Sequence, residues 1–168
     1  MLEWFRDYLS NRKQAVVIKG FKSEYLTVEA GVPQGSVLGP VLFPIYINDI
    51  TLDISSVIKL FADDTSMYKS LNHDDTRSQL LNQDLDKIST WASKWKVLFN
   101  SLKTKLLNIK RSNTLIPNTL TFEGSILTHV DSHKHLGLII QHNGKWDEHI
   151  DAIVTRCRSL VSCLKSYK

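Results

Sequence analysis

The feature that most constrains the fold is the segment Val57–Tyr68, in which two carboxylates interrupt an otherwise mainly apolar sequence. The residues on either side of Asp63 and Asp64 are rich in β-branched and aromatic types, which are typical of strands. Asp is disfavoured in strands and favoured in turns, so the segment predicts a β-hairpin with both aspartates at its bend. Asp-Asp is nevertheless a poor two-residue turn, because such turns need positive φ and usually contain Asn-Gly or Asp-Gly.

An electrostatic argument points to a role for the pair beyond chain reversal. The flanking apolar residues, such as Phe61 and Tyr68, predict a partly buried hairpin, where unpaired carboxylates are costly. Two charges about 4 Å apart repel by roughly 4 kcal/mol at an effective dielectric near 20. A divalent cation would remove this repulsion, and Mg²⁺ prefers oxygen ligands. Asp63 and Asp64 therefore fit one half of a two-metal centre, whose ions lie about 3.5–4 Å apart.

A glycine-rich segment, GVPQGSVLGP at residues 31–40, precedes the hairpin. Its density of Gly and Pro predicts an irregular loop whose backbone adopts unusual angles or approaches another group closely. It is neither a Walker loop nor a GxGxxG motif. Taken alone, it is best explained as a tight connection into a helix. The alternative is that backbone N–H groups at the helix start bind phosphate and that Gln34 contacts a base or sugar.

The remaining pattern predicts an α+β domain with helices packed on one face of an antiparallel sheet. Ser36 is a candidate N-cap, Pro44 predicts a kink, and Thr76 opens a capping box. Helices are expected at residues 2–9, from near Ser36 to Ile50 (buried), from Thr76 to Trp95 and from about Asp147. Strands are expected at 14–19 and 25–28, which form a hairpin around Gly20, and at 103–110, 119–122, 126–130 and 135–141. A turn is expected at Asn143-Gly144.

Composition excludes some classes of protein. The 168 residues suit a single domain, and no stretch approaches the roughly 20 apolar residues of a membrane span. The charged N-terminus lacks the apolar centre of a signal peptide, so we expect an intracellular protein, nuclear or cytoplasmic. Cys157 and Cys163 are then expected to be reduced and partly buried. A net charge of +4 tolerates a polyanionic partner without proving one.

Several ordered blocks resemble the reverse transcriptases of non-LTR retrotransposons, the LINE-like group that includes jockey-type elements. The blocks are GVPQGSVLGPVLFPIYINDI, KLFADDT, TWASKWKVLFNSLKTKLL and SHKHLGLIIQHNGKWDEHI. The resemblance implies an RNA-directed DNA polymerase palm at residues 1–141 and the start of a thumb, including a thumb-type helix, at residues 142–168. It also implies that an RNA template, a DNA primer and deoxynucleoside triphosphates are its partners.

The resemblance assigns roles to individual residues. It implies two Mg²⁺ ions at Asp63 and Asp64, contacts of Pro33, Gln34 and Gly35 with the incoming nucleotide and template, a position near the triphosphate for Lys103, and a primer grip at His135, Leu136 and Gly137.

Two departures from the family pattern lower the activity expected of this chain. Pro44 stands where the family usually has an apolar helix former. The family's first catalytic aspartate and its fingers would lie upstream of Met1, so we expect the chain to be inactive, or nearly so, by itself. The alternative function is that of a non-catalytic nucleic-acid-binding remnant.

Three other groups of residues were weighed. For His129, His133 and His135, solvated histidines at strand edges are favoured over a metal site, because no ligand set completes it. Trp91 and Trp95 follow a helical apolar stripe, which favours a core position over a base-stacking platform. The basic residues Arg156, Arg158 and Lys165 fit a nucleic-acid contact and a solvated helix face equally well.

Overall fold

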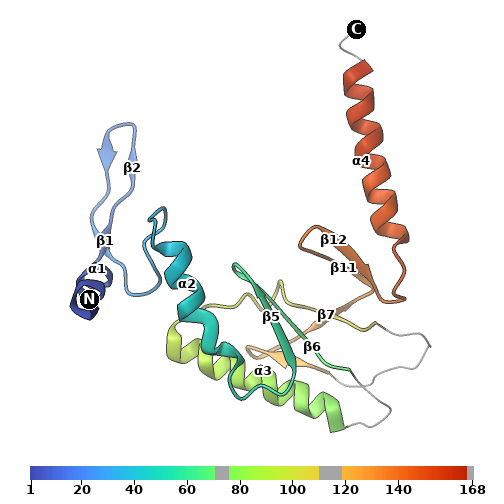
Figure 1. Cartoon of the computed structure of the whole chain (residues 1–168), viewed down its shortest axis with the longest axis horizontal. Coiled ribbons are helices and arrows are strands. Elements are labelled where there is room, and N and C mark those ends of the chain that lie inside the picture. The colour runs from blue at the N-terminus through green and yellow to red at the C-terminus, as the bar shows by residue number, and fades with distance from the viewer. Residues whose placement is uncertain (71–75, 110–118, 166–168) are drawn as a thin grey trace. The chain divides into compact units, whose positions relative to one another are not determined.

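The computed structural model describes residues 1–70, 76–109 and 119–165, and only the backbone of residues 76–78. The chain forms two compact units (Figure 1). The first contains Met1–Lys69 with Ser93–Lys96, and the second contains Ser70–Ala92 with Val97–Lys168.

Helices alternate with runs of consecutive strands along the chain. In order, they are α1 (Leu2–Leu9), β1 (Lys13–Gln14), β2 (Val17–Ile18), β3 (Phe21–Lys22), β4 (Leu26–Thr27), α2 (Gly39–Ile47), the 3₁₀ helix η1 (Asn48–Thr51), β5 (Val57–Phe61), β6 (Asp64–Tyr68), α3 (Thr76–Trp95), β7 (Lys105–Leu107), β8 (Thr121–Phe122), β9 (Ser125–Ile126), β10 (Thr128–Val130), β11 (Ser132–His135), β12 (Leu138–Gln141) and α4 (Asp147–Lys165).

The mixture of helices and strands confirms the α+β class. Across the described ranges the strands pair only in twos, so a single antiparallel sheet is not formed there. The pair β7–β10 is parallel, with Leu106 opposite His129, whereas the other pairs are antiparallel. A parallel pair needs a connection of a dozen or more residues, which residues 108–127 provide. The palm-like sheet with helices on one face therefore stays a prediction.

The first hairpin confirms the expected turn around Gly20. Val17–Ile18 pairs antiparallel with Phe21–Lys22, and β1 pairs with β4 further from the turn. Lys19 and Gly20 have φ values of 49° and 86°, the positive values that a two-residue hairpin turn requires. The strand expected at 14–19 is split into β1 and β2, the strand expected at 25–28 contains only β4, and β3 lies before it. Ser23 interrupts the pairing between the two strand pairs, where its Oγ accepts from the Val16 N–H at 3.0 Å.

Helix α2 begins at Gly39, later than the start near Ser36 that the sequence predicts. Ser36 still acts at the helix start, since its Oγ accepts from the Gly39 N–H at 2.9 Å. The helix continues through Pro44, although this residue has no N–H to donate to the Pro40 carbonyl. The expectation of a buried helix is wrong along most of its length: only Gly39 and Ile47 are buried, because the other side chains lack neighbours that exclude water.

Tyr46 connects α2 to the end of α3 within the first unit. Its hydroxyl donates to the Trp95 carbonyl, one of the C-terminal groups that a helix leaves without an intrahelical partner. The two rings also meet edge to face, with centroids 5.7 Å apart. Burial, together with the negative charge of Asp49, raises the pKa of Tyr46, so the hydroxyl keeps the proton that it donates.

The second unit packs around the apolar stripe of α3, which begins and ends where the sequence predicts. Leu81, Leu85 and Ile88 are buried, as are Ala92 of the same helix and Phe122 of β8. The tryptophans are less buried than expected: Trp91 is half-buried and Trp95 is exposed. The small Ala92 occupies the deeper position, because the stripe turns gradually around a helix of 3.6 residues per turn. The expected capping box at Thr76 lies outside the described side chains.

Asn82 links α3 to the chain around β8. Its Oδ1 accepts from the Thr121 N–H at 3.0 Å and its Nδ2 donates to the Thr119 carbonyl at 3.3 Å. The side-chain amide thus pairs with the backbone as a neighbouring strand would.

We expect Asn82→Ala to destabilise the second unit by about 1–2 kcal/mol, because both backbone groups lose a partner. Urea denaturation measures this effect, and hydrogen exchange at the Thr121 amide should accelerate. Gln83→Ala, at the next and exposed position of the same helix, is the control and should change stability by less than about 0.5 kcal/mol. Equal effects of the two substitutions would contradict the linking role.

The segment 135–141 is not the single strand that the sequence predicts, but the turn and second strand of a hairpin that begins at Ser132. β11 pairs with β12, with His135 opposite Leu138, so the chain reverses at Leu136-Gly137. Both turn residues have positive φ, 49° and 88°. The apolar run that follows them gave the segment the pattern of one continuous strand. The Asn143-Gly144 turn is confirmed: the Gly144 N–H donates to the Gln141 carbonyl at 3.0 Å.

Helix α4 begins at Asp147 as expected and is anchored by β12. The buried Gln141 accepts from the Glu148 N–H at 3.2 Å, which satisfies a donor in the first turn of the helix. The apolar stripe of α4 is exposed throughout. Cys157 and Cys163 are not in a disulfide, and they are exposed, not partly buried, because they belong to this uncovered helix. Of the helices in the described ranges, none has the length and hydrophobicity to cross a lipid bilayer.

Candidate functional site

The Asp63-Asp64 hairpin forms as predicted, with the two aspartates in different parts of it. β5 and β6 pair antiparallel over five residue pairs, from Val57 opposite Tyr68 to Phe61 opposite Asp64. Ala62 and Asp63 are therefore the turn, and Asp64 begins β6. Ala62 has a φ of 50° and therefore occupies the left-handed position of the turn. Neither aspartate has to adopt this conformation, for which Asp-Asp is poorly suited. Adjacent carboxylates are thus held at the end of a regular ladder.

The two carboxylates are exposed, which corrects the expectation of a partly buried tip. Phe61 is 63% exposed and Tyr68 is 54% exposed, so the flanking side chains do not cover the aspartates. Water screens much of their repulsion, which at a bulk-water dielectric falls to about 1 kcal/mol at 4 Å. Within the described ranges, neither aspartate forms an ion pair with a basic side chain. No cluster of three or more metal-ligating side chains occurs in those ranges.

The glycine-rich loop adopts both kinds of geometry that the sequence predicts. Gly31 and Gly35 have φ values of 78° and 76°, which other residues adopt only with strain. A Cβ at Gly39 would lie 3.2 Å from both the Pro33 carbonyl and the Ser36 Oγ, so this glycine permits a close approach. Ser36 Oγ also donates to the Pro33 carbonyl at 2.8 Å. The loop is therefore closed on itself before α2 begins.

The start of α2 does not offer free N–H groups to a phosphate. The Gly39 N–H is bonded to Ser36, Pro40 has none, and the N–H groups of Val41 and Leu42 donate to the Leu38 carbonyl at 3.0 and 2.9 Å. The structure thus disfavours the phosphate alternative at the helix start. The side of the loop that carries Pro33 and Gln34 is the better candidate for a ligand contact.

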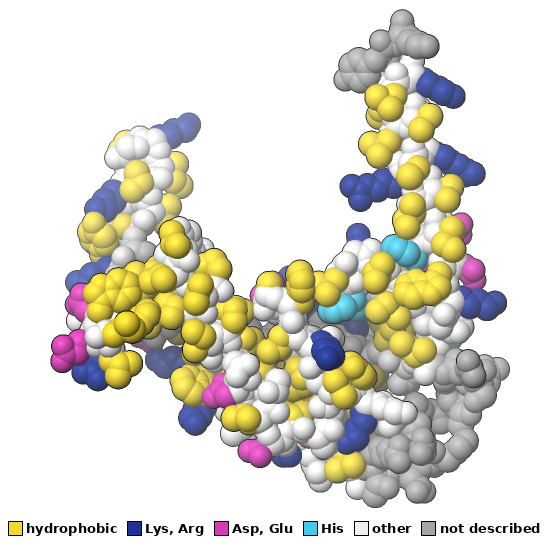
Figure 2. Space-filling view, in the orientation of Figure 1, with side chains coloured by type: hydrophobic (Ala, Val, Ile, Leu, Met, Phe, Trp, Pro, Cys, Tyr) yellow, Lys and Arg dark blue, Asp and Glu magenta, His cyan; other side chains and the backbone are white. Residues whose placement is uncertain are grey.

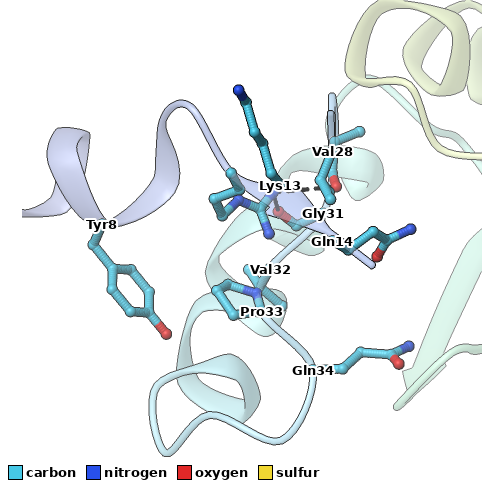
Figure 3. A pocket seen from close by; sticks show the side chains of 10 residues that line it. Tyr8, Lys13, Gln14, Val28, Gly31, Val32, Pro33 and Gln34 are labelled. Atoms are coloured by element: carbon cyan, nitrogen blue, oxygen red, sulfur yellow. Dashed lines mark hydrogen bonds between the residues drawn. The ribbon is translucent and has the colours of Figure 1, made fainter. Parts of the chain in front are cut away.

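Pro33 and Gln34 line a pocket of about 660 Å³ in the first unit. Residues from α1, β1 and the end of the first hairpin complete it, among them Tyr8, Arg12 and Gln14. Figure 3 shows Tyr8 approaching the loop from α1, while Gln14 and Gln34 extend their side chains in the same direction. The Tyr8 hydroxyl is buried and has no hydrogen-bond partner in the described part of the chain.

The sequence analysis missed the residues contributed by the N-terminal segment. In the sequence, the run Arg12–Gln14 has the pattern of a helix end followed by the start of a strand. Only the fold brings these residues to the glycine-rich loop. Arg12 is half-buried, which is unusual for an arginine that has no carboxylate partner in the described ranges. The one sequence signal for a role of Arg12 was its basic side chain within a short polar run.

Lys103 and the segment His135–Gly137 belong to the second unit, whereas the Asp hairpin and the glycine-rich loop belong to the first. Lys103 is exposed and lies in a turn, where its N–H donates to the Asn100 Oδ1 at 3.1 Å. The strand expected from Lys103 begins only at Lys105, because this turn precedes it. His135 ends β11, and Leu136 and Gly137 form the tight turn.

Leu136 combines a strained backbone with an exposed side chain. Its φ of 49° lies in the left-handed region, which Asn or Gly adopts more readily, and the side chain is 49% exposed. We expect Leu136→Asn to stabilise the hairpin by about 0.5–1 kcal/mol, measured by thermal denaturation. If Leu136 contacts a primer, the same substitution should weaken binding of an RNA–DNA duplex in a fluorescence anisotropy titration.

Lys134→Asn, on the neighbouring strand position, is the control for Leu136→Asn. Lys134 is exposed and lies within β11, where no left-handed residue is needed, so no gain in stability is expected. Unchanged duplex affinity in Leu136→Asn would contradict a primer contact, and unchanged stability would contradict the strain.

The remaining candidates are the histidines of β10 and β11 and the basic residues of α4. His133 and His135 share a strand face, as predicted, with rings 6.4 Å apart, and His129 is exposed. The basic residues Arg156, Arg158 and Lys165 are exposed on α4, where Figure 2 shows basic and hydrophobic side chains interspersed. Both interpretations of these basic residues stay open.

Comparison with known proteins identifies the family. The family model for Reverse transcriptase (RNA-dependent DNA polymerase) matches residues 1–140, so the chain belongs to the reverse transcriptase family. It is 28% identical to the RNA-directed DNA polymerase from mobile element jockey of Drosophila funebris, over 96% of this chain and 18% of that relative. It is 31% identical to the probable RNA-directed DNA polymerase from transposon X-element of Drosophila melanogaster, over 94% of this chain and 18% of the relative.

These matches confirm the resemblance to jockey-type, non-LTR elements. The chain spans 18% of the length of the curated relatives just named, so it corresponds to a part of each. No solved structure matches the chain significantly.

Proposed function

We propose that this chain forms the catalytic hairpin and the nucleotide-contacting loop of an RNA-directed DNA polymerase of a non-LTR retrotransposon. The observation that carries the proposal is the β5–β6 hairpin, which places the consecutive residues Asp63 and Asp64 at its exposed end. Membership of the reverse transcriptase family supports the same conclusion.

The donor chemistry of the hairpin fits a divalent cation. Asp63 and Asp64 offer hard carboxylate oxygens, which Mg²⁺ prefers, and both are accessible to an ion that keeps part of its water shell. Two Mg²⁺ ions, when bound, would stabilise the attacking and leaving oxygens of a phosphoryl transfer. The protein's own contribution is to hold the two aspartates at the end of a paired hairpin, one in the turn and one at the start of β6. A further carboxylate ligand would have to come from elsewhere in a longer polypeptide.

The glycine-rich loop is proposed to contact the incoming deoxynucleoside triphosphate and the template. Gln34 can donate and accept hydrogen bonds at a base or sugar, and Pro33 offers an apolar surface. Gly35 permits the backbone turn that separates these residues from α2. The pocket beside Pro33 and Gln34 gives such a ligand room to approach.

The second unit is proposed to supply the other contacts. Lys103 is exposed and can pair with a triphosphate, and the turn His135–Gly137 is proposed as the primer grip. Residues 1–141 would then be the palm and residues 142–168 the start of the thumb, with an RNA template and a DNA primer as partners.

The proposal is tested with an RNA template annealed to a DNA primer and a longer polypeptide that contains this chain and supplies the further carboxylate ligand. Mg²⁺-dependent extension that follows the template supports the polymerase function. Duplex binding that weakens with salt, without extension, favours the alternative of a non-catalytic nucleic-acid-binding remnant, since phosphate contacts are salt-dependent. A chain that neither binds nor extends contradicts both.

A further inference from the structure

Arg12 lies between the end of α1 and β1 and reaches the start of the glycine-rich loop. Its Nε donates to the Leu9 carbonyl at 3.0 Å, and its Nη2 donates to the carbonyls of Ala30 and Gly31, the first of these at 3.2 Å. Its own carbonyl accepts from the Val28 N–H at 2.9 Å. Three of these four bonds join Arg12 to the segment Val28–Gly31, and the fourth fixes its side chain to the end of α1.

The bonded carbonyls lie where regular pairing has ended. β4 ends at Thr27, and Gly31 turns the chain with a φ of 78°, so the carbonyls of Ala30 and Gly31 have no strand opposite them. Both residues are exposed, so water could also serve these carbonyls, but only a bond to Arg12 ties them to another segment of the chain. A guanidinium suits this task, because it has several donors in a fixed planar fork that can serve three carbonyls at once.

The site of these bonds is the wall of the pocket. Arg12, Ala30 and Gly31 line it together with Pro33 and Gln34, which follow directly in the chain. The orientation of the Gly31 peptide therefore determines the direction in which the chain continues to Pro33 and Gln34. A chain with two glycines of positive φ in this short stretch has many competing conformations.

We propose that Arg12 is a positioning residue that holds the Gly31–Gly35 loop in its nucleotide-contacting conformation. This inference rests on the proposed function. Arg12 need not touch the nucleotide: by bonding the carbonyls at the loop's start, it lowers the conformational entropy that nucleotide binding would otherwise have to remove.

The test uses Arg12→Ala and Arg12→Lys in the 168-residue chain. Lysine keeps the charge and loses the planar fork, so Arg12→Lys should behave like Arg12→Ala and not like the wild type. Arg6→Ala is the matched control, because Arg6 is an exposed arginine on α1. Hydrogen exchange is measured at the amides of Val32, Gln34 and Gly35 and, for comparison, across β5 and β6.

In both Arg12 variants the loop amides should exchange about tenfold faster or more, while β5 and β6 keep their protection. The affinity for dTTP with Mg²⁺, on an RNA–DNA template–primer whose next template base is adenine, should fall about tenfold. Millimolar guanidinium ion should restore much of this affinity to Arg12→Ala. Arg6→Ala should leave exchange and affinity unchanged.

The outcomes separate this inference from the proposed function. Unchanged loop exchange in Arg12→Ala, or faster exchange throughout the first unit, overturns the positioning role. Unchanged dTTP affinity with a loosened loop overturns it as well. A wild-type chain that does not bind dTTP overturns the proposed nucleotide site, and the inference with it.

Discussion

In a longer polypeptide that supplies the further carboxylate ligand, replacing Asp63 and Asp64 together by Asn is expected to reduce Mg²⁺-dependent primer extension by on the order of a thousandfold or more. Asn keeps the size of the side chain and loses the negative charge that attracts a cation. Stability should change by less than about 0.5 kcal/mol, because both side chains are exposed. The prediction is therefore a loss of activity without a loss of folding, measured by single-turnover extension and by thermal denaturation.

A metal titration tests the same pair independently of catalysis. Paramagnetic Mn²⁺ should broaden the backbone amide signals of residues 62–65 in the wild type and not in the double variant. Asp86→Asn, at an exposed position of α3, is the control and should leave both the titration and any extension unchanged. Identical broadening in the wild type and the double variant would contradict a metal site at Asp63 and Asp64.

Ile50→Ala should give the largest loss of stability among single substitutions in the first unit, about 2–5 kcal/mol. Ile50 is 1% exposed and lies in η1, the 3₁₀ helix that follows α2, so its truncation removes buried apolar surface and leaves a cavity. Urea denaturation monitored by circular dichroism measures the change in the free energy of unfolding.

The matched control is Ile45→Ala, the same substitution within α2. Ile45 is 68% exposed, and Ala is the better helix former, so we expect a change of less than about 0.5 kcal/mol. Comparable losses at Ile45 and Ile50 would mean that the burial of Ile50 does not determine the stability of this unit.

The elements with strong local signals could be predicted. The spacing of Leu81, Leu85 and Ile88 defines α3, and the structure buries all three. The run on either side of Asp63 defines the β5–β6 hairpin, and the glycines of the loop adopt the geometries expected of them. These predictions succeed because a helical period or a backbone requirement acts over a few residues.

The turn at Leu136-Gly137 shows where local reasoning fails. Gly137 is a single turn signal and Leu136 beside it is a poor residue for positive φ, so the sequence separates β11 from β12 only weakly, and the pairing of His135 with Leu138 decides the matter. Helix α2 is a second case. Its apolar sequence predicts burial, yet Val41 and Ile45 are 57% and 68% exposed, because burial depends on neighbours and not on composition.

The candidate site was only partly predictable for the same reason. Pro33, Gln34, Asp63 and Asp64 could be singled out from motifs that are continuous in the chain. Arg12 could not, because its contacts with Ala30 and Gly31 join segments that are distant in sequence.

The amino-acid sequence by itself determined the family, the hairpin with its adjacent carboxylates and the positions that require glycine, since each depends on residues that are neighbours in the chain. Only the tertiary structure decided that the carboxylates are exposed, that the strands of the described ranges pair in twos, and that Arg12 bonds the carbonyls of Ala30 and Gly31. Exposure and long-range hydrogen bonds depend on which segments meet in space, and no local pattern of residues encodes this.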